Sequence, residues 1–381
     1  MLKRDKLAQT VMATKPTEFF KNKTQQNSLL FDLWMQLACG VIKIDESNSS
    51  YSVLAVDGSQ IYPDRHMSDS GCFLINTGAC YLSYAPTFVP ASGGVQSIAQ
   101  GATSIAKLFS EPYLFFDEQV SQELESTFSP DIVDLKREEL EFAEALQQSL
   151  VLRTVSGEGQ DLSVGPETVN TGTDSHVQSF VCLLDGSLIF GQLENKPEKI
   201  QKYYLKKYLE ILSAFHDRNI LIASYISLPA SKDLIIRLVK AGKSSELESQ
   251  GLCDAQLMAK FLPIGHRTTL FCNYAKITEQ YPDYLKPHFF YLNVGQEIVR
   301  IELPAWVAKN EQHSNFIAYV CLNQCKKGFG YPVALAEAHE QAVVKSADRD
   351  FFYHLIQRKS IELCKPVVFS QKILKKQGMG F

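Results

Sequence analysis

Long hydrophobic runs are absent from this chain of 381 residues. The longest apolar stretches, such as ILIASYISL from Ile220, have the length of a strand and fall far short of the roughly 20 residues that a membrane helix needs. The charged N-terminus, MLKRDKLAQT, is followed by further polar residues and not by the apolar core of a signal peptide. We therefore expect a globular, cytoplasmic protein without a membrane span, and its 45% of hydrophobic residues can form a sizeable core.

Paired cysteine motifs are absent as well. None of the nine cysteines forms a CxxC pair, and an odd number in a chain of this length favours reduced thiols over a disulfide framework. Cys321 and Cys325 are the only close pair, and a separation of about one helical turn suits two core-facing residues. We expect no zinc site, because the chain offers no further ligands to complete one.

Two more absences narrow the function. No GxxxxGK[ST] loop is present, and the glycines of ASGGVQSIAQG lack the spacing of a dinucleotide fingerprint, so a nucleotide-binding regulator has no support. The formal net charge of -4 argues against binding nucleic acid through bulk positive charge. The exception is the tail 344–381, which holds eight Lys and Arg against three Asp and Glu. It is either a phosphate-facing patch or a solvated helix end, and its candidate DNA contacts are Lys372, Lys375 and Lys376.

What is present is an orderly alternation of strand and helix patterns. The predicted strands are 51–56, two strands within 71–86 that meet tightly at Thr77-Gly78, 179–187 and 220–228. The predicted helices are 119–150, 197–217 and 230–241. The order β-β-β-α-β-α-β-α is that of an RNase H-like α/β domain, in which helices flank a mixed sheet.

The regions outside this series complete the expected organisation. Gly/Ser/Thr-rich loops begin at Pro86 and span about 154–178, and a hairpin is expected around Gly295-Gln296. A last long helix starts at Pro332, a residue suited to the first helical position. The expected segments are an N-terminal helical segment (1–48), the RNase H-like core (49–245) and a C-terminal part that packs on the core (246–381).

Two aspartates share one sequence context. Asp57 follows VLAV, Asp185 follows VCLL, and both precede Gly-Ser, so each carboxylate should emerge at the carboxyl end of a buried strand. If the two strands are neighbours, as the first and fourth strands of an RNase H-like sheet are, the aspartates can share a metal. The alternative is structural, because Asp-Gly is a strong hairpin signal and FVCLLDGSLIFG also fits a simple hairpin.

Phosphodiester hydrolysis would give these carboxylates a role. Mg²⁺ and Mn²⁺ take oxygen ligands, and two such ions roughly 4 Å apart can activate water and stabilise the departing oxygen. A third carboxylate is then expected on the acidic helix, where Glu138 and Glu141 are three residues apart and share a face. A solvated glutamate on an amphipathic helix is the commoner situation, and the pattern does not choose between these interpretations.

A further pair of candidates lies near the C-terminus. Tyr331 and His339 are eight positions apart in GYPVALAEAHEQAV, slightly over two helical turns, so both can face one side. Beside a metal-bound phosphate they could contact the scissile group, and the histidine could protonate the leaving oxygen. A packed tyrosine and a surface histidine are the simpler alternative.

Five segments, in this order and separation, resemble the motifs of bacterial NurA-domain proteins: AVDGSQIYPDR, LLDGSL, YISLPAS, FFYLNVGQEIVRIELPAWV and GYPVALAEAHEQAV. The resemblance covers nearly the whole chain, from about residue 50 to 375. It implies an RNase H-like, dimeric, manganese-dependent nuclease, with magnesium as the alternative metal. Such a protein degrades DNA from 5′ ends and cuts single strands in concert with a HerA-type hexameric ATPase, in DNA end processing, repair or defence.

Carried over by motif, the resemblance assigns the metal-binding aspartates to Asp57 and Asp185 and the final motif to Tyr331 and His339. The family's R-x-x-L-E pattern fits the segment that ends at Glu141, so this residue is the predicted third carboxylate. The C-terminal part, 246–381, would then complete the active site. The competing hypothesis is a catalytically silent dimeric adaptor that only docks the ATPase.

Overall fold

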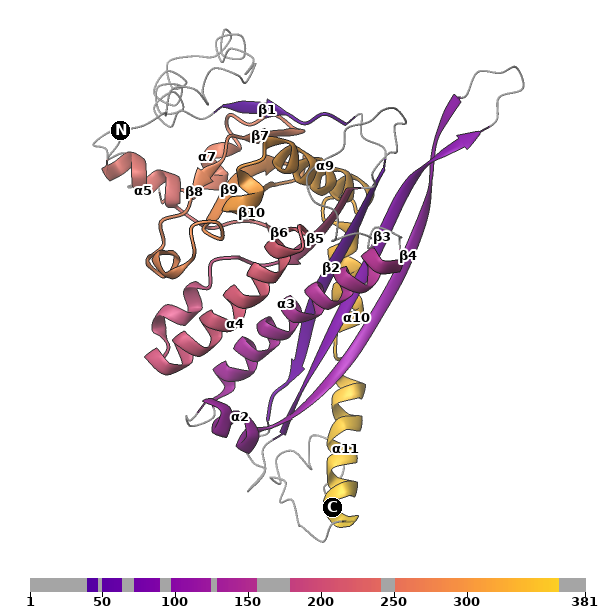
Figure 1. The fold of residues 1–381 in the computed structure, drawn as a ribbon, viewed down its shortest axis with the longest axis vertical. Helices are drawn as coiled ribbons and strands as arrows, with labels where there is room; N and C mark the ends of the chain where they lie inside the picture. Colours follow the sequence, from indigo (N-terminus) through magenta and orange to yellow (C-terminus); the bar gives the residue numbers. More distant parts are fainter. Residues whose placement is uncertain are drawn as a thin grey trace, which may run out of the picture. The chain divides into compact units, whose positions relative to one another are not determined.

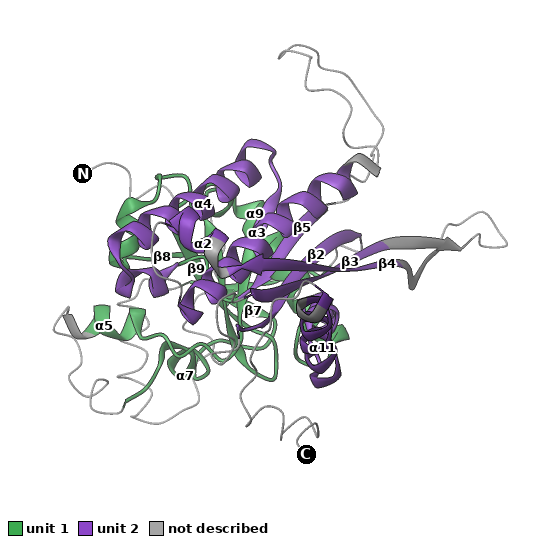
Figure 2. Ribbon diagram, turned by 90° about the horizontal axis from the view of Figure 1, so that it is seen from below, with its two compact units in different colours: residues 1–48, 186–189, 223–332 green, residues 49–185, 190–222, 333–381 purple. Residues whose placement is uncertain are grey.

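The computed structural model describes residues 40–46, 50–63, 72–89, 97–124, 129–155, 179–240 and 251–362. The chain divides into two compact units that interleave along the sequence (Figure 2). Unit 1 comprises Met1–Asn48, Gly186–Ile189 and Ala223–Pro332; unit 2 comprises Ser49–Asp185, Phe190–Ile222 and Val333–Phe381. Each unit therefore draws on more than one of the consecutive segments that we delimited from the sequence.

A mixed sheet forms the centre of unit 2 (Figure 1). Its strands are β2 (Tyr51–Ile61), β3 (Cys72–Val89), β4 (Ser97–Phe116) and β5 (Ser179–Asp185), in the order β5-β2-β3-β4. β3 is antiparallel to both β2 and β4, whereas β5 is parallel to β2. This is the arrangement expected for the first four strands of an RNase H-like sheet, and the predicted fold class is confirmed.

One predicted turn of this sheet lies at a different place in the structure. The turn predicted at Thr77-Gly78 is wrong, because both residues lie within the single long strand β3. A Cβ on Gly78 would lie 2.2 Å from the Ala342 backbone nitrogen, so glycine is required there by the close approach of a helix. The third strand is instead β4, part of which we had assigned to the loop after Pro86. Its described side chains are mostly exposed, so β4 lacks the alternation of buried and exposed residues that identifies strands.

Helices cover both faces of this sheet. α3 (Pro130–Val155) packs on β2, and α10 (Val333–Ala342) packs on both β2 and β3. Successive side chains of a strand point to opposite faces. Because Gly58 meets α3 and the preceding Asp57 contacts α10, these two helices lie on opposite faces of β2.

Two long helices predicted from the sequence are each divided. The region 119–150 contains α2 (Asp117–Leu124) and α3, with Pro130 in the first position of α3. The last helix is α10 followed by α11 (Ser346–Glu362). Between them lie two β-branched residues, of which Val344 donates its N–H to Ser59 Oγ at 3.3 Å. The predicted helix at 197–217 is confirmed as α4 (Glu198–Asp217).

Unit 1 contains an antiparallel sheet. Its strands, in the order in which they pair, are β1 (Val41–Lys43), β7 (His266–Thr268), β9 (Pro287–Asn293), β10 (Ile298–Pro304) and the part of β6 (Leu221–Ile226) from Ala223. The short strand β8 (Phe271–Cys272) also pairs with β9. The predicted hairpin around Gly295-Gln296 is confirmed, because β9 and β10 pair along their whole length. Helix was expected throughout 1–48, and β1 corrects this for residues 41–43.

Within its described residues, unit 1 contains the helices α5 (Asp233–Lys240), α7 (Asp254–Met258), α8 (Ala305–Ala308) and α9 (Glu311–Lys327), and the 3₁₀ helix η3 (Lys276–Gln280). α5 and α7 bury an apolar cluster with β9 that includes Leu234, Met258 and Phe289. Cys321 and Cys325 on α9 are both buried, as predicted for core-facing residues. In the part of the chain that is described, no helix is long and apolar enough to cross a membrane.

Candidate active site

Asp57 is the first residue after the fully buried part of β2. The strand continues to Ile61, so Asp57 does not lie at the strand end as the sequence had indicated. The Asp57 side chain is 18% exposed, and its Oδ2 lies 2.6 Å from His339 Nδ1 on α10. Its Oδ1 accepts the Gly58 N–H at 2.8 Å. The structure therefore brings together two of the predicted site residues, Asp57 and the exposed His339.

Asp185 lies beside Asp57 on the neighbouring strand. The parallel register of β2 and β5 pairs Val56 with Leu184, so the two aspartates follow one residue further along adjacent strands. Neighbouring strands are roughly 4.8 Å apart, which makes the two aspartate backbones adjacent. The hairpin alternative for FVCLLDGSLIFG is wrong, because β5 ends at Asp185 and the chain continues into the 3₁₀ helix η2 (Gly191–Asn195).

Helix α3 brings two glutamates to this region, the buried Glu141 and the partly exposed Glu138. Glu141 is only 8% exposed and lies 2.5 Å from an Arg137 guanidinium nitrogen. A Cβ on Gly58 would lie 2.5 Å from Glu141 Oε1, so the glycine after Asp57 is what permits the approach of Glu141. Burial raises the pKa of Glu141 to about 8, with the charges of Asp57 and Glu138 adding to the effect and Arg137 opposing it.

Glu138 has a different set of partners. Its carboxylate accepts hydrogen bonds from Tyr208 Oη at 2.9 Å and from the Gln192 side chain. Burial raises the pKa of Glu138 to about 7, although both hydrogen bonds and Arg137 oppose the shift. Of the two glutamates that the sequence left open, Glu141 is therefore the one packed against the peptide that follows Asp57.

The donor set fits a hard divalent cation. Carboxylate oxygens are the ligands that Mn²⁺ and Mg²⁺ prefer, and a nearby cation would stabilise the ionised form of a buried carboxyl group such as Glu141. Among the described residues, however, no three His, Cys, Asp or Glu side chains already form a metal-binding cluster. Asp57 and Glu141 are engaged with His339 and Arg137, and both would have to exchange these partners for the ion. Arg137 Nε is also buried without a hydrogen-bond partner, so the site retains an unused donor.

Over residues 51–344 the sequence matches the family model of the NurA domain. The chain belongs to the NurA family. The resemblance indicated by the five motifs is thereby confirmed, and Asp57, Glu141, Asp185, Tyr331 and His339 all lie within the matched NurA region. No curated protein sequence matches the chain significantly.

Solved NurA structures are similar to this chain at low sequence identity. The NurA nuclease from Sulfolobus solfataricus has a TM-score of 0.51 and 13% identity, over 95% of this chain and 98% of the other, and supports the fold. A NurA structure with manganese has a TM-score of 0.38 and 11% identity, over 90% and 95% of the two chains. A NurA structure bound to dAMP and manganese has a TM-score of 0.32 and 13% identity, over 85% and 90%.

Tyr331 precedes the NurA helix that carries His339. It lies in unit 1, two residues before α10 begins at Val333, so Tyr331 and His339 do not share a helix face as the spacing had predicted. Its ring packs edge-on against Tyr225, with 5.5 Å between the ring centroids. The predicted contact residues of the tail, Lys372, Lys375 and Lys376, lie outside the described residues, as does nearly all of the 154–178 loop.

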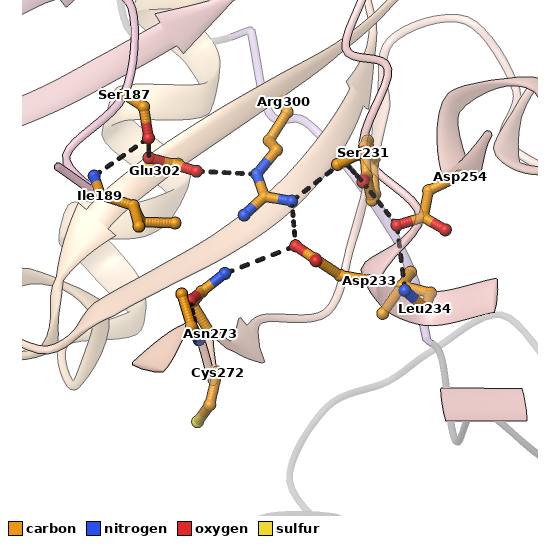
Figure 3. Close-up of polar contacts among 12 residues, drawn as sticks. Ser187, Ile189, Ser231, Asp233, Leu234, Asp254, Cys272, Asn273, Arg300 and Glu302 are labelled. Atoms are coloured by element: carbon orange, nitrogen blue, oxygen red, sulfur yellow. Dashed lines mark hydrogen bonds and ion pairs between the residues drawn. The ribbon is translucent and has the colours of Figure 1, made fainter. Parts of the chain in front are cut away.

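The turn that follows Asp185 in this NurA chain is held by a network that the sequence analysis missed (Figure 3). Glu302 Oε2 accepts hydrogen bonds from the Ser187 hydroxyl at 2.7 Å and from the Leu188 N–H at 2.9 Å. The other Glu302 oxygen lies 2.8 Å from Arg300 Nε, and Arg300 reaches Asp233 at 2.6 Å. The signal was available in EIVRIEL, because two charged residues in an apolar strand must be paired if they are buried.

Proposed function

We propose that this NurA-family chain is a metal-dependent deoxyribonuclease. The observation that supports this most strongly is the adjacency of Asp57 and Asp185 on parallel strands, with Glu141 approaching the peptide after Asp57 from α3. β5 ends at Asp185, so within the described part of unit 2 the residues of β2 after Val56 pair with β3 alone. In this proposal, carboxylates from both faces of the unit 2 sheet hold an ion beside the part of β2 that follows Val56.

Each site residue has a distinct role in this proposal. Asp57, Glu141 and Asp185 hold Mn²⁺, with Mg²⁺ as the alternative, and the metal supplies water activation and stabilisation of the departing oxygen. His339, which is hydrogen-bonded to Asp57, would donate a proton to the leaving oxygen. Tyr331 contacts the scissile phosphate. The tail lysines Lys372, Lys375 and Lys376 neutralise DNA phosphates.

The wider proposal is a homodimer that works with a HerA-type hexameric ATPase. The activities would be a 5′-to-3′ exonuclease and a single-strand endonuclease. Support for a dimer comes from β4, the last strand of the unit 2 sheet, which exposes four large apolar side chains. They are Ile105, Leu108, Leu114 and Phe116, between 43% and 55% exposed. Because an apolar edge strand is normally covered, a second copy of this chain fits there. Leu108→Lys combined with Leu114→Lys should convert a dimer to a monomer in light scattering.

The deciding experiment uses linear DNA labelled at one end, with the purified chain and Mn²⁺, Mg²⁺ or EDTA. Cleavage with Mn²⁺ that EDTA abolishes is expected, and full activity after exhaustive chelation would overturn the metal mechanism. The runner-up function is the catalytically silent adaptor. It would be favoured by a chain that binds the ATPase but cleaves no DNA with either metal, whether or not the ATPase is present.

A further inference from the structure

A cysteine and a histidine face each other on neighbouring strands of unit 1. Cys272 on β8 is the register partner of His288 on β9. Cys272 Sγ lies 3.1 Å from His288 Nε2, and both side chains are partly exposed. Figure 3 shows the Cys272 side chain directed away from the polar network that contains Arg300 and Asp233. The thiol is therefore partnered with an imidazole and remains partly accessible.

The orientation of the imidazole determines the direction of this hydrogen bond. His288 Nδ1 lies 3.0 Å from the Lys286 carbonyl oxygen, which can only accept a hydrogen bond. Nδ1 therefore carries the ring hydrogen, and Nε2 of the neutral ring presents its lone pair to the thiol. The Cys272 S–H donates to Nε2 and can transfer its proton there, as in other pairs of cysteine and an oriented histidine.

The surrounding charges favour the thiolate. Arg237 on α5 donates to the Cys272 carbonyl oxygen and stacks on Tyr274, with 4.5 Å from its guanidinium carbon to the ring centroid. The hydrogen bond to His288 lowers the pKa of Cys272 although burial acts in the opposite direction, and the charges of His288 and Arg237 add to the lowering. Burial lowers the pKa of His288, but the hydrogen bond and charge of Cys272, together with the hydrogen bond to the Lys286 carbonyl, outweigh burial, and the net shift of the pKa is upward.

Other charged groups near the pair act more weakly or indirectly. Lys309, at the end of α8, opposes protonation of His288. Asp233 at the start of α5 reaches the neighbouring Asn273 side chain at 3.4 Å and is itself paired with Arg300. The buried cysteines of the core differ from Cys272 in the direction of their pKa shift, because burial raises the pKa of Cys182 to about 12 and that of Cys325 to about 11.

We propose that Cys272 and His288 form a reactive thiol site that is modified by low-molecular-weight disulfides. This site shares no residue with the proposed nuclease site, and the proposal does not depend on the nuclease function. The Cys272 thiolate attacks one sulfur of a disulfide RSSR, so a protein–SR bond forms and the S–S bond of the reagent breaks. The departing RS⁻ takes the proton held on His288 and leaves as RSH. Cys272 is thereby oxidised to a mixed disulfide while one sulfur of the reagent is reduced.

The test measures modification of individual cysteines in the full chain by oxidised glutathione, using peptide mass spectrometry. Cys253, a partly exposed cysteine at the start of α7, is the reference thiol in the same sample. An ordinary thiol is only about 1% ionised at pH 6.5. We expect Cys272 to react at least about fivefold faster than Cys253 at this pH.

The matched variants are His288→Gln and His266→Gln. His266 has the same local contact, with Nδ1 3.0 Å from the carbonyl oxygen two residues earlier, but it lies on β7. His288→Gln should bring the Cys272 rate at pH 6.5 down to that of Cys253, and His266→Gln should not change it. Buried Cys321 reports folding, because it becomes modified only if the variant unfolds.

Two results would overturn the proposal. One is a Cys272 rate equal to that of Cys253 at pH 6.5 in the parent protein, or a Cys272 rate that rises about tenfold per pH unit up to about pH 7.5, as for an ordinary thiol. This result decides the matter even if His288→Gln does not fold. The other is a folded His288→Gln variant in which Cys272 keeps its faster reaction.

Discussion

Glu141→Gln should stabilise the metal-free protein at neutral pH while removing its stabilisation by Mn²⁺. Burial raises the pKa of Glu141 from 4.5 to about 8, even with Arg137 beside it. Between these values the unfolded chain releases a proton that the folded protein retains. The contribution of Glu141 to stability is therefore fully present below pH 4.5 and is lost as the pH rises through about 8.

The size of the effect follows from this difference in pKa. Each pKa unit corresponds to about 1.4 kcal/mol, and about 2.5 units lie between the unfolded-state pKa and pH 7. Ionisation of Glu141 in the unfolded chain therefore lowers the free energy of unfolding by roughly 2–4 kcal/mol at pH 7. Glutamine has a similar volume and ionises in neither state, so the variant should gain this amount.

Urea unfolding at pH 5 and pH 8 in the presence of a chelator measures this gain. The variant should be much closer to the parent in stability at pH 5 than at pH 8. The matched control is Glu139→Gln, on the same helix and also 8% exposed, because Glu139 is paired with Lys136 at 2.9 Å. This control should show no gain, since it only loses an ion pair.

Adding Mn²⁺ then tests the link to function. An ion at 100 times its dissociation constant stabilises a folded protein by about 2.7 kcal/mol. The parent and the Glu139→Gln control should show a shift of this kind, and Glu141→Gln should show much less. A Glu141→Gln protein that is less stable than the parent at pH 8 without metal would refute the reasoning. It would mean that attraction to Arg137 outweighs the burial of the carboxylate.

Three further predictions concern the site and its support. Asp57→Asn and Asp185→Asn should each nearly eliminate cleavage of DNA. The double variant should cleave little more slowly than either single variant, because the effects of mutating residues that act as a unit do not add. Substantial cleavage by Asp185→Asn would reject a shared site. His339→Ala should lower turnover by about 10² to 10⁴ with Mn²⁺ affinity nearly unchanged, and a calorimetric loss of affinity as large as that of the aspartate variants would show that it binds metal instead. Glu302→Gln should lower the free energy of unfolding, measured by urea unfolding, by about 3–5 kcal/mol, because the buried Arg300 charge loses one of its two carboxylate partners. The control is Glu297→Gln, at a more exposed glutamate, which should lower it by less than about 1 kcal/mol.

Local sequence patterns were sufficient to predict the strands whose apolar residues form one contiguous run. The apolar runs before Asp57 and Asp185 predicted two interior strands, and β2 and β5 are these strands. The hairpin around Gly295-Gln296 was also predicted, because its turn and both flanking strands are contiguous in the chain. The β-β-β-α-β order gave the correct neighbours even though one strand was misplaced, since an RNase H-like sheet constrains which strands can pair.

The tertiary structure decided what depends on contacts between distant segments. Thr77-Gly78 has the composition of a turn, yet both residues lie within β3. Glycine is needed at position 78 because the backbone of α10, more than 250 residues later, packs against it. Glu138 and Glu141 are equivalent on a helical pattern, and only the packing of α3 on β2 distinguishes them, by bringing Glu141 to Gly58. The sequence by itself determined which residue types carry the proposed chemistry, namely carboxylates and a histidine. The fold determined their partners, since the hydrogen bond between Asp57 and His339 joins positions whose proximity no local pattern encodes.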